Sequence, residues 1–169
     1  MSRFVKEVSV RNRLAVVALV AVGFGTQGSA QDAKQPGHVL LKPAEAKWGD
    51  PPPALPKGAQ FLLVSGDPGK PGPFAIRIKM PAGYKIAPHW HPTDEHVTVL
   101  AGTFSMGMGE KFDAAALTDL PAGGYGLMPA QMRHFATAKT AATIQVHGTG
   151  PFSLTYVNAA DDPRNAATK

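Results

Sequence analysis

The stretch GYKIAPHWHPTDEHVTVLAG, residues 83–102, contains three of the six histidines in the 169-residue chain. In an extended strand, residues i and i+2 point the same way, so the imidazoles of His89 and His91 share one face. A turn then returns the chain, and Glu95 begins a second strand with a carboxylate near that pair. Two imidazoles and a carboxylate are ligands that divalent Fe, Mn, Ni, Cu, Co and Zn accept.

The neighbours of these polar groups favour a buried metal site, and the alternative is a polar surface turn. Ile86, Trp90 and the β-forming run at 97–100 are typical of a core. Unpaired histidines in a core would be energetically costly, which argues for a bound metal. His96 follows Glu95 directly, so strand alternation turns it to the opposite face, and we interpret it as a surface or packing residue.

The composition indicates a folded domain rich in turns and short strands. Hydrophobic residues make up 44% of the chain and charged residues 17%, while glycine (18) and proline (16) are both frequent. The chain has no cysteine, which excludes disulfides and thiolate chemistry. Basic residues are scattered without aromatic interleaving, so nothing in the sequence supports a nucleic-acid partner.

Residues 1–30 have the pattern of a secretory leader. Four basic residues precede an apolar stretch at 14–25, and this stretch is too short to span a bilayer. Small side chains at 28–30 then offer a cleavage site after Ala30. We therefore expect a periplasmic or secreted protein, with no membrane attachment once the leader is removed; a buried or membrane-anchoring helix is the alternative.

Apolar and polar residues alternate along several short runs after residue 60. The clearest is 74–80, which places Phe74, Ile76, Ile78 and Met80 on one face. Further predicted strands lie at 60–64, 103–108, 126–128, 135–138, 143–147 and 152–157, and a short helical turn is predicted within 113–120. This pattern predicts an all-β sandwich or barrel.

The predicted organisation has four parts. A signal peptide covers residues 1–30, and an extension with a candidate strand at 38–42 (HVLLK) covers 31–58. The barrel covers 59–158, and a disordered tail covers 159–169. We see no repeat and no second domain.

Two motifs in the chain resemble those of the cupin superfamily. The first motif is Gly-X5-His-X-His-X3–4-Glu-X6-Gly, and every fixed position is matched, by Gly83, His89, His91, Glu95 and Gly102. The second is Gly-X5-Pro-X-Gly-X2-His-X3-Asn, and GGYGLMPAQMRHFATA (residues 123–138) matches it at Gly123, Pro129 and His134. It departs from the motif at Gln131, where a turn glycine is expected, and at Ala138, where an asparagine is expected.

The resemblance implies a double-stranded β-helix, which is a jelly-roll barrel, with a metal inside its wide mouth. It further implies that His89, His91, Glu95 and His134 bind one divalent transition metal per chain. Three neutral imidazoles and one carboxylate would leave a divalent ion with a net charge of +1.

We consider two functions for such a centre. The first is a metal-dependent cupin enzyme, an oxygenase or isomerase, that acts on a small organic acid or phenolic compound. The alternative is a non-enzymatic module that binds or senses a small ligand. A base in the pocket would favour the enzyme, and His147 is the candidate if Gln145 and His147 face the interior; an outward polar face is the other interpretation.

The sequence also suggests what the protein contacts. We expect a small-molecule ligand with an anionic or phenolic head, held against apolar walls that include Trp90, Val97, Val99, Phe104 and Phe135. Exposed sheet edges in a short barrel are often covered by a second subunit, so we expect a homodimer in which residues 38–42 take part.

Overall fold

The computed structural model describes residues 37–166. Strand β2 (Gly72–Met80) contributes one of its faces to the core. The predicted alternation along β2 is confirmed, because Phe74, Ile76, Ile78 and Met80 are all buried. Burying side chains of this size contributes about 1.5–3 kcal/mol each. One face of β2 therefore belongs to the hydrophobic core.

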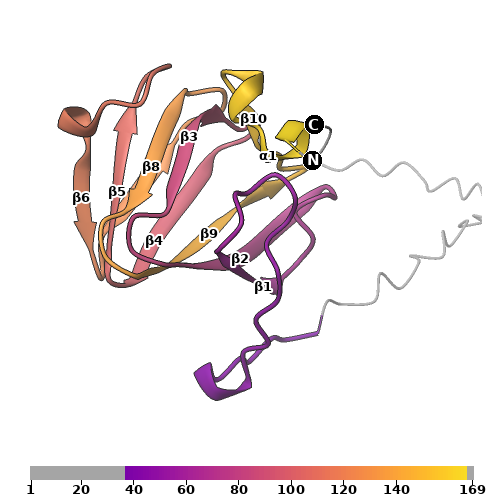
Figure 1. Ribbon diagram of the computed structural model, residues 1–169. Coiled ribbons are helices and arrows are strands. Elements are labelled where there is room, and N and C mark those ends of the chain that lie inside the picture. The colour runs from indigo at the N-terminus through magenta and orange to yellow at the C-terminus, as the bar shows by residue number, and fades with distance from the viewer. Residues whose placement is uncertain (1–36, 167–169) are drawn as a thin grey trace, which may run out of the picture. The chain divides into compact units, whose positions relative to one another are not determined.

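Within residues 37–166, ten strands form two antiparallel sheets. Figure 1 shows the two sheets facing each other. The first sheet has the order β1-β2-β9-β4-β7, and the second has the order β10-β3-β8-β5-β6. The remaining strands are β1 (Gln60–Ser65), β3 (Lys85–Trp90), β4 (Glu95–Ala101), β5 (Thr103–Met108), β6 (Thr118–Pro121), β7 (Tyr125–Met128), β8 (His134–Ala138), β9 (Ala142–Gly150) and β10 (Thr155–Tyr156). The all-β prediction is confirmed.

The pairing of strands is that of a jelly roll. Strand β2 pairs with β9, β3 with β8, β4 with β7, and β5 with β6, so the two halves of the chain run alongside each other as one long folded hairpin. Successive pairs fall in alternate sheets, and the inner faces of both sheets contribute to one hydrophobic core. This is the double-stranded β-helix that the resemblance implied.

The N-terminal extension and the tail differ from the predictions. Residues 38–42 form no strand, since no other strand pairs with them, and Leu40 is 85% exposed. A 3-10 turn, η1 (Pro43–Glu45), follows them. At the other end, the predicted strand at 152–157 is reduced to β10. The expected disordered tail instead folds through residue 166.

Two short helical segments order the tail, η3 (Ala159–Asp161) and α1 (Pro163–Ala166). The Asn158 side chain caps η3 by accepting a hydrogen bond from the amide of Ala160 at 3.1 Å. The Arg164 guanidinium donates to the carbonyl of Leu154 at 3.2 Å. Local polar contacts of this kind are not visible as hydrophobic periodicity, which is why the sequence pattern indicated disorder.

The helical turn expected within 113–120 is present as η2 (Ala114–Ala116), and β6 follows it. Among the residues that the structure describes, no helix is long and apolar enough to cross a bilayer. The predicted leader at 1–30 lies outside the described residues.

Gln131 adopts the backbone conformation of the glycine that it replaces in the second motif. Its φ is 64°, the left-handed region, and its amide donates to the carbonyl of His91 at 2.7 Å. The motif's turn is therefore kept, at a steric cost of about 1–2 kcal/mol for a residue with a Cβ. Ala138, the second departure, is fully buried in β8.

We expect Gln131→Gly to stabilise the protein by about 0.5–1 kcal/mol, because relief of the left-handed strain exceeds the extra entropy of glycine in the unfolded chain. The matched control is Ala130→Gly, next to it in the same turn but without a positive φ. This control should lose stability. Urea unfolding of both variants measures the difference, and equal effects would contradict the strain argument.

Candidate metal centre

An irregularity in β3 turns His89 toward the interior. Ile86 pairs with Ala136 and His89 pairs with His134, so three steps along β3 match two along β8. One extra residue in a strand shifts the alternation of its side chains by one. Ile86 and His89 are consequently both buried and both line the same cavity, although regular alternation would place them on opposite faces.

The three other motif residues come from separate places in the chain. His91 follows the end of β3, Glu95 opens β4 opposite Met128, and His134 opens β8 directly opposite His89. The structure thus brings all four predicted ligand residues together. Each is at least 92% buried, as its exposed fraction is 8% or less.

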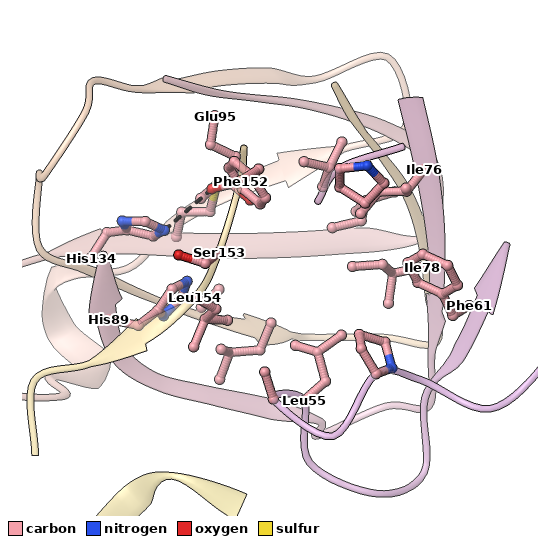
Figure 2. Close-up of a pocket in the computed structure, with 18 of the residues that line it drawn as sticks. Leu55, Phe61, Ile76, Ile78, His89, Glu95, His134, Phe152, Ser153 and Leu154 are labelled. Atoms are coloured by element: carbon pink, nitrogen blue, oxygen red, sulfur yellow. Dashed lines mark ion pairs between the residues drawn. The ribbon is translucent and has the colours of Figure 1, made fainter. Parts of the chain in front are cut away.

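Three imidazoles converge closely enough to hold a metal ion. One nitrogen from each of His89, His91 and His134 lies within 4.8 Å of the others. The carboxylate of Glu95 faces the same point, with Oε2 at 3.3 Å from His134 Nε2 and 3.6 Å from His91 Nε2. Figure 2 shows Glu95 and His134 joined by the first of these contacts.

Backbone carbonyls hold the far side of every ring. Nδ1 of His89 lies 2.8 Å from the carbonyl of Ala87, and Nδ1 of His134 lies 2.9 Å from that of Met132. His91 Nδ1 contacts the carbonyl of Ser153 at 2.8 Å. A carbonyl only accepts, so each Nδ1 carries the proton and donates it, and each Nε2 keeps a lone pair.

The inner atoms of this cluster have no hydrogen-bond partner. His91 Nε2, His134 Nε2 and Glu95 Oε2 are buried and unpaired among the described residues. In this tautomer the two nitrogens have no proton to give to the carboxylate, so lone pairs face a negative charge at short distance. A cation at this point would satisfy all of them, and the cluster therefore fits a divalent metal.

Burial sets the protonation states of the cluster. Desolvation, assisted by the neighbouring His134 and His91, lowers the pKa of His89 to about 3. Burial also lowers the pKa of His91. Burial alone would raise the pKa of Glu95, but in acid a hydrogen bond donated by protonated His134 and the positive charges of the protonated imidazoles outweigh it and bring the value to about 2. At neutral pH, His89 and His91 are thus neutral and Glu95 is ionised, as metal ligands need to be.

A cavity of about 250 Å³ adjoins the cluster, and His89, Glu95 and His134 lie in its wall. The remaining wall is mainly apolar and comes from both sheets and from two segments outside the barrel. Figure 2 shows the cluster at one side of this cavity, with Ile76, Ile78 and Phe61 on the other. Among the described residues, the only polar lining side chains outside the cluster are Ser153 and Arg164.

The predicted cavity walls are mostly wrong. Phe104 lines the cavity, but Val97 and Val99 pack elsewhere in the core. Trp90 and Phe135 alternate to the outer side, where the ring of Phe135 packs 5.0 Å from Phe112. The bulge and the register between strands decide these directions, so the sequence pattern alone could not settle them.

The C-terminal segment supplies wall residues that the sequence reasoning missed. Phe152 stacks on the ring of His91, with centroids 4.2 Å apart and planes at 17°. Phe152, Ser153 and Leu154 line the cavity together with Pro52 and Leu55 of the proline-rich segment, residues 49–57 (GDPPPALPK). Residues 152–154 lie before β10 although a strand was predicted at 152–157, and the proline-rich segment has no periodic pattern, so the sequence indicated neither position.

His147 does not reach the cavity, so the prediction that it acts there as a base is wrong. Strand β9 buries Ile144 and Val146 and turns His147 to the outer face of its sheet. There it stacks on His96, with centroids 4.8 Å apart and planes at 12°. His96 Nδ1 in turn lies 2.6 Å from the hydroxyl of Tyr125. The outward placement predicted for His96 is confirmed.

Comparisons with known proteins support the same fold. A structure search matches a candidate acetylacetone dioxygenase from Methylibium petroleiphilum PM1, with 24% identity over 76% of this chain and 87% of that one, at a TM-score of 0.58. The polyketide cyclase RemF from Streptomyces resistomycificus matches with 15% identity over 79% and 94% of the two chains, also at 0.58.

An RmlC-like cupin from Shewanella frigidimarina NCIMB 400 matches with 16% identity over 68% of this chain and 91% of that one, at a TM-score of 0.53. Sequence identities this low show a common fold alone. No curated protein has significant sequence similarity to the chain. The family model of the ChrR cupin-like domain, however, matches residues 36–153, which include both histidine motifs. The protein is therefore a cupin and belongs to the family of ChrR cupin-like domains.

Proposed function

We propose that this cupin holds one divalent transition metal with His89, His91, Glu95 and His134, and binds a small organic acid or phenolic compound beside it. The observation that carries this proposal is the group of buried, unpaired inner atoms that face one point at the edge of a cavity. A polar cluster without a cation would leave these atoms desolvated and uncompensated, which is energetically costly.

The donor set suits several metals. Imidazole and carboxylate ligands accept Fe, Mn, Ni, Cu, Co or Zn, and such an ion, when bound, supplies Lewis-acid or redox chemistry. The residues of the chain bind the metal and shape the cavity beside it. His89, Glu95 and His134 lie in the cavity wall, and the apolar residues around them exclude water and hold the carbon body of a ligand.

The dimensions and polarity of the cavity favour a small ligand with few polar groups. Its volume of about 250 Å³ is below the roughly 300–1,000 Å³ of pockets for drug-sized molecules. A sugar or nucleotide would need many hydrogen-bonding partners, and this wall offers few. A head group that contacts the metal and an apolar body that contacts the wall match these features.

A specific observation also favours the second candidate function, ligand binding without turnover. Within the described residues, the cavity wall contains no histidine or carboxylate beyond the cluster itself, and so no separate base. Turnover would then depend on the metal and on the substrate's own reactivity. Because one structural relative is a candidate dioxygenase, oxygen uptake is the discriminating measurement.

We expect small carboxylic acids or phenols to stabilise the metal-loaded protein and not the metal-stripped protein. At a concentration one hundred times its dissociation constant, a ligand should raise the free energy of unfolding by about 2.7 kcal/mol. A thermal-shift screen on both forms measures this, with polyols and nucleotides as controls. Stabilisation by the controls alone would contradict the proposal, and oxygen consumption with a stabilising compound would identify an enzyme.

Export and self-association belong to the same proposal. We propose that the leader-like residues 1–30 direct the protein to the periplasm or outside the cell. We also propose a homodimer, supported by the exposed Val39 and Leu40, whose side chains have no cover within the described chain.

A further inference from the structure

One basic side chain, Arg164, lines the metal-side cavity and also an outer groove. The cavity and the groove share Pro52, Leu55 and Arg164 as lining residues, so the two hollows border each other at this point. The proline-rich segment supplies Pro52 and Leu55, and helix α1 supplies Arg164. A ligand in the cavity can therefore contact Arg164.

The guanidinium of Arg164 is held in a fixed orientation. Its Nε lies 2.8 Å and 3.0 Å from the two carboxylate oxygens of Asp162, and its Nη2 lies 2.6 Å from Oδ2. Nη2 also donates to the carbonyl of Leu154. No hydrogen bond within the described residues uses Nη1, which leaves N–H donors for a ligand. A guanidinium oriented in this way is well suited to bind a carboxylate or phenolate.

Arg164 is also distinctive by its charge. The charged side chains of the cavity wall are Glu95, which belongs to the metal cluster, and Arg164. Asp162 pairs with Arg164, whose side chain is 46% exposed. The wall between the cluster and Arg164 is largely apolar, so a charge-assisted hydrogen bond from Arg164 is the main polar contact open to a ligand there.

We infer that Arg164 is the specificity-determining residue of the cavity and selects ligands that carry a free carboxylate over neutral ligands of the same shape. This inference rests on the proposed function, because it assigns selectivity to a cavity whose ligand also contacts the metal. It names small aromatic or aliphatic carboxylates as the preferred class, with the carboxylate beside Arg164 and a second polar group, such as a phenolic oxygen, beside the metal cluster.

The test compares salicylate, which is anionic at pH 7, with catechol, which is neutral at pH 7 and has a similar ring and oxygen pair. Calorimetric titration of the zinc-loaded protein gives both dissociation constants, and zinc avoids redox turnover. We expect Arg164→Gln to weaken the affinity for salicylate about tenfold, because one charge-assisted hydrogen bond is lost. The affinity for catechol should change less than about twofold. Arg164→Lys should recover part of the salicylate affinity.

Two further variants separate recognition from folding. Arg77→Gln removes an equal charge from the outer face of β2, where Arg77 Nε donates to Gln145, and should leave both affinities unchanged. Asp162→Asn removes the carboxylate that orients Arg164, so it should change the affinity for salicylate more than the affinity for catechol. Equal weakening of both probes by Arg164→Gln would overturn the inference.

The outcomes also distinguish this inference from the proposed function. If the wild-type protein binds salicylate equally with and without zinc, the metal-dependent function fails, while the comparison of Arg164→Gln with Arg77→Gln still decides the role of Arg164. If metal-dependent binding is present but Arg164→Gln leaves the ratio of the two affinities unchanged, the proposed function stands and the role of Arg164 is rejected.

Discussion

The protein is expected to lose most of its bound metal when any one of four buried side chains is replaced by alanine: His89, His91, Glu95 or His134. Each supplies an inner atom to the same point, and three of these atoms have no other partner among the described residues. Loss of even a supporting contact costs 10–100-fold in metal affinity, so loss of a ligand should cost at least about a hundredfold. Elemental analysis of the purified variants, with metal titration, measures this loss.

His96→Ala and His147→Ala are the matched controls, because both histidines stack on the outer face of the first sheet, away from the cluster. They should retain the wild-type metal content. Circular dichroism of every variant establishes that the fold persists, so that metal loss is not confused with unfolding. Full metal content in the four cluster variants would reject the assignment of these residues as ligands.

The metal-free protein should lose about 2 kcal/mol of stability between pH 7.5 and pH 5 from His89 alone. The folded pKa of this residue, about 3, lies below its unfolded value of 6.5. Below pH 6.5 the unfolded chain therefore takes up a proton that the folded protein does not, and stability falls as the pH drops toward 3. The pKa of His91 is lowered in the same direction, so it adds to this loss.

Urea unfolding of the metal-free protein at pH 7.5, 6 and 5 measures this dependence, and His89→Gln should reduce its slope. The cluster has another acid-sensitive group, Glu95, whose folded pKa of about 2 lies below its ordinary value of 4.5. Its contribution is lost only as the pH falls below about 4.5, so the two windows can be separated. A stability that does not change between pH 7.5 and 5 would contradict the burial of neutral histidines.

The fold could be predicted largely from local patterns in the sequence. The alternation in β2 and the spacing of Gly83, His89, His91 and Glu95 depend only on which neighbours share a face of a strand. These relations hold within a few residues, so they can be predicted without knowledge of the rest of the chain. The resemblance of the two motifs to those of cupins, and not a local pattern, implied the jelly roll and added the distant His134 to the cluster.

Contacts outside regular strands could not be predicted in this way. The ordered turn of Asn158 and Arg164 depends on capping and on a carbonyl ten residues away, and the proline-rich segment gives no periodic signal. The position of Gln131 in a left-handed turn is a further example, since the surrounding structure imposes a conformation that glutamine rarely adopts alone.

The sequence by itself thus determined an all-β barrel and the identity of the residues in its polar cluster. Only the tertiary structure decided which side chains face the cavity, because one extra residue in β3 reverses the alternation and brings Ile86 and His89 to the same side. It likewise turned His147 outward and placed Arg164 in the cavity wall. Facing direction depends on register between strands and on the docking of distant segments, which are long-range properties that no local pattern contains.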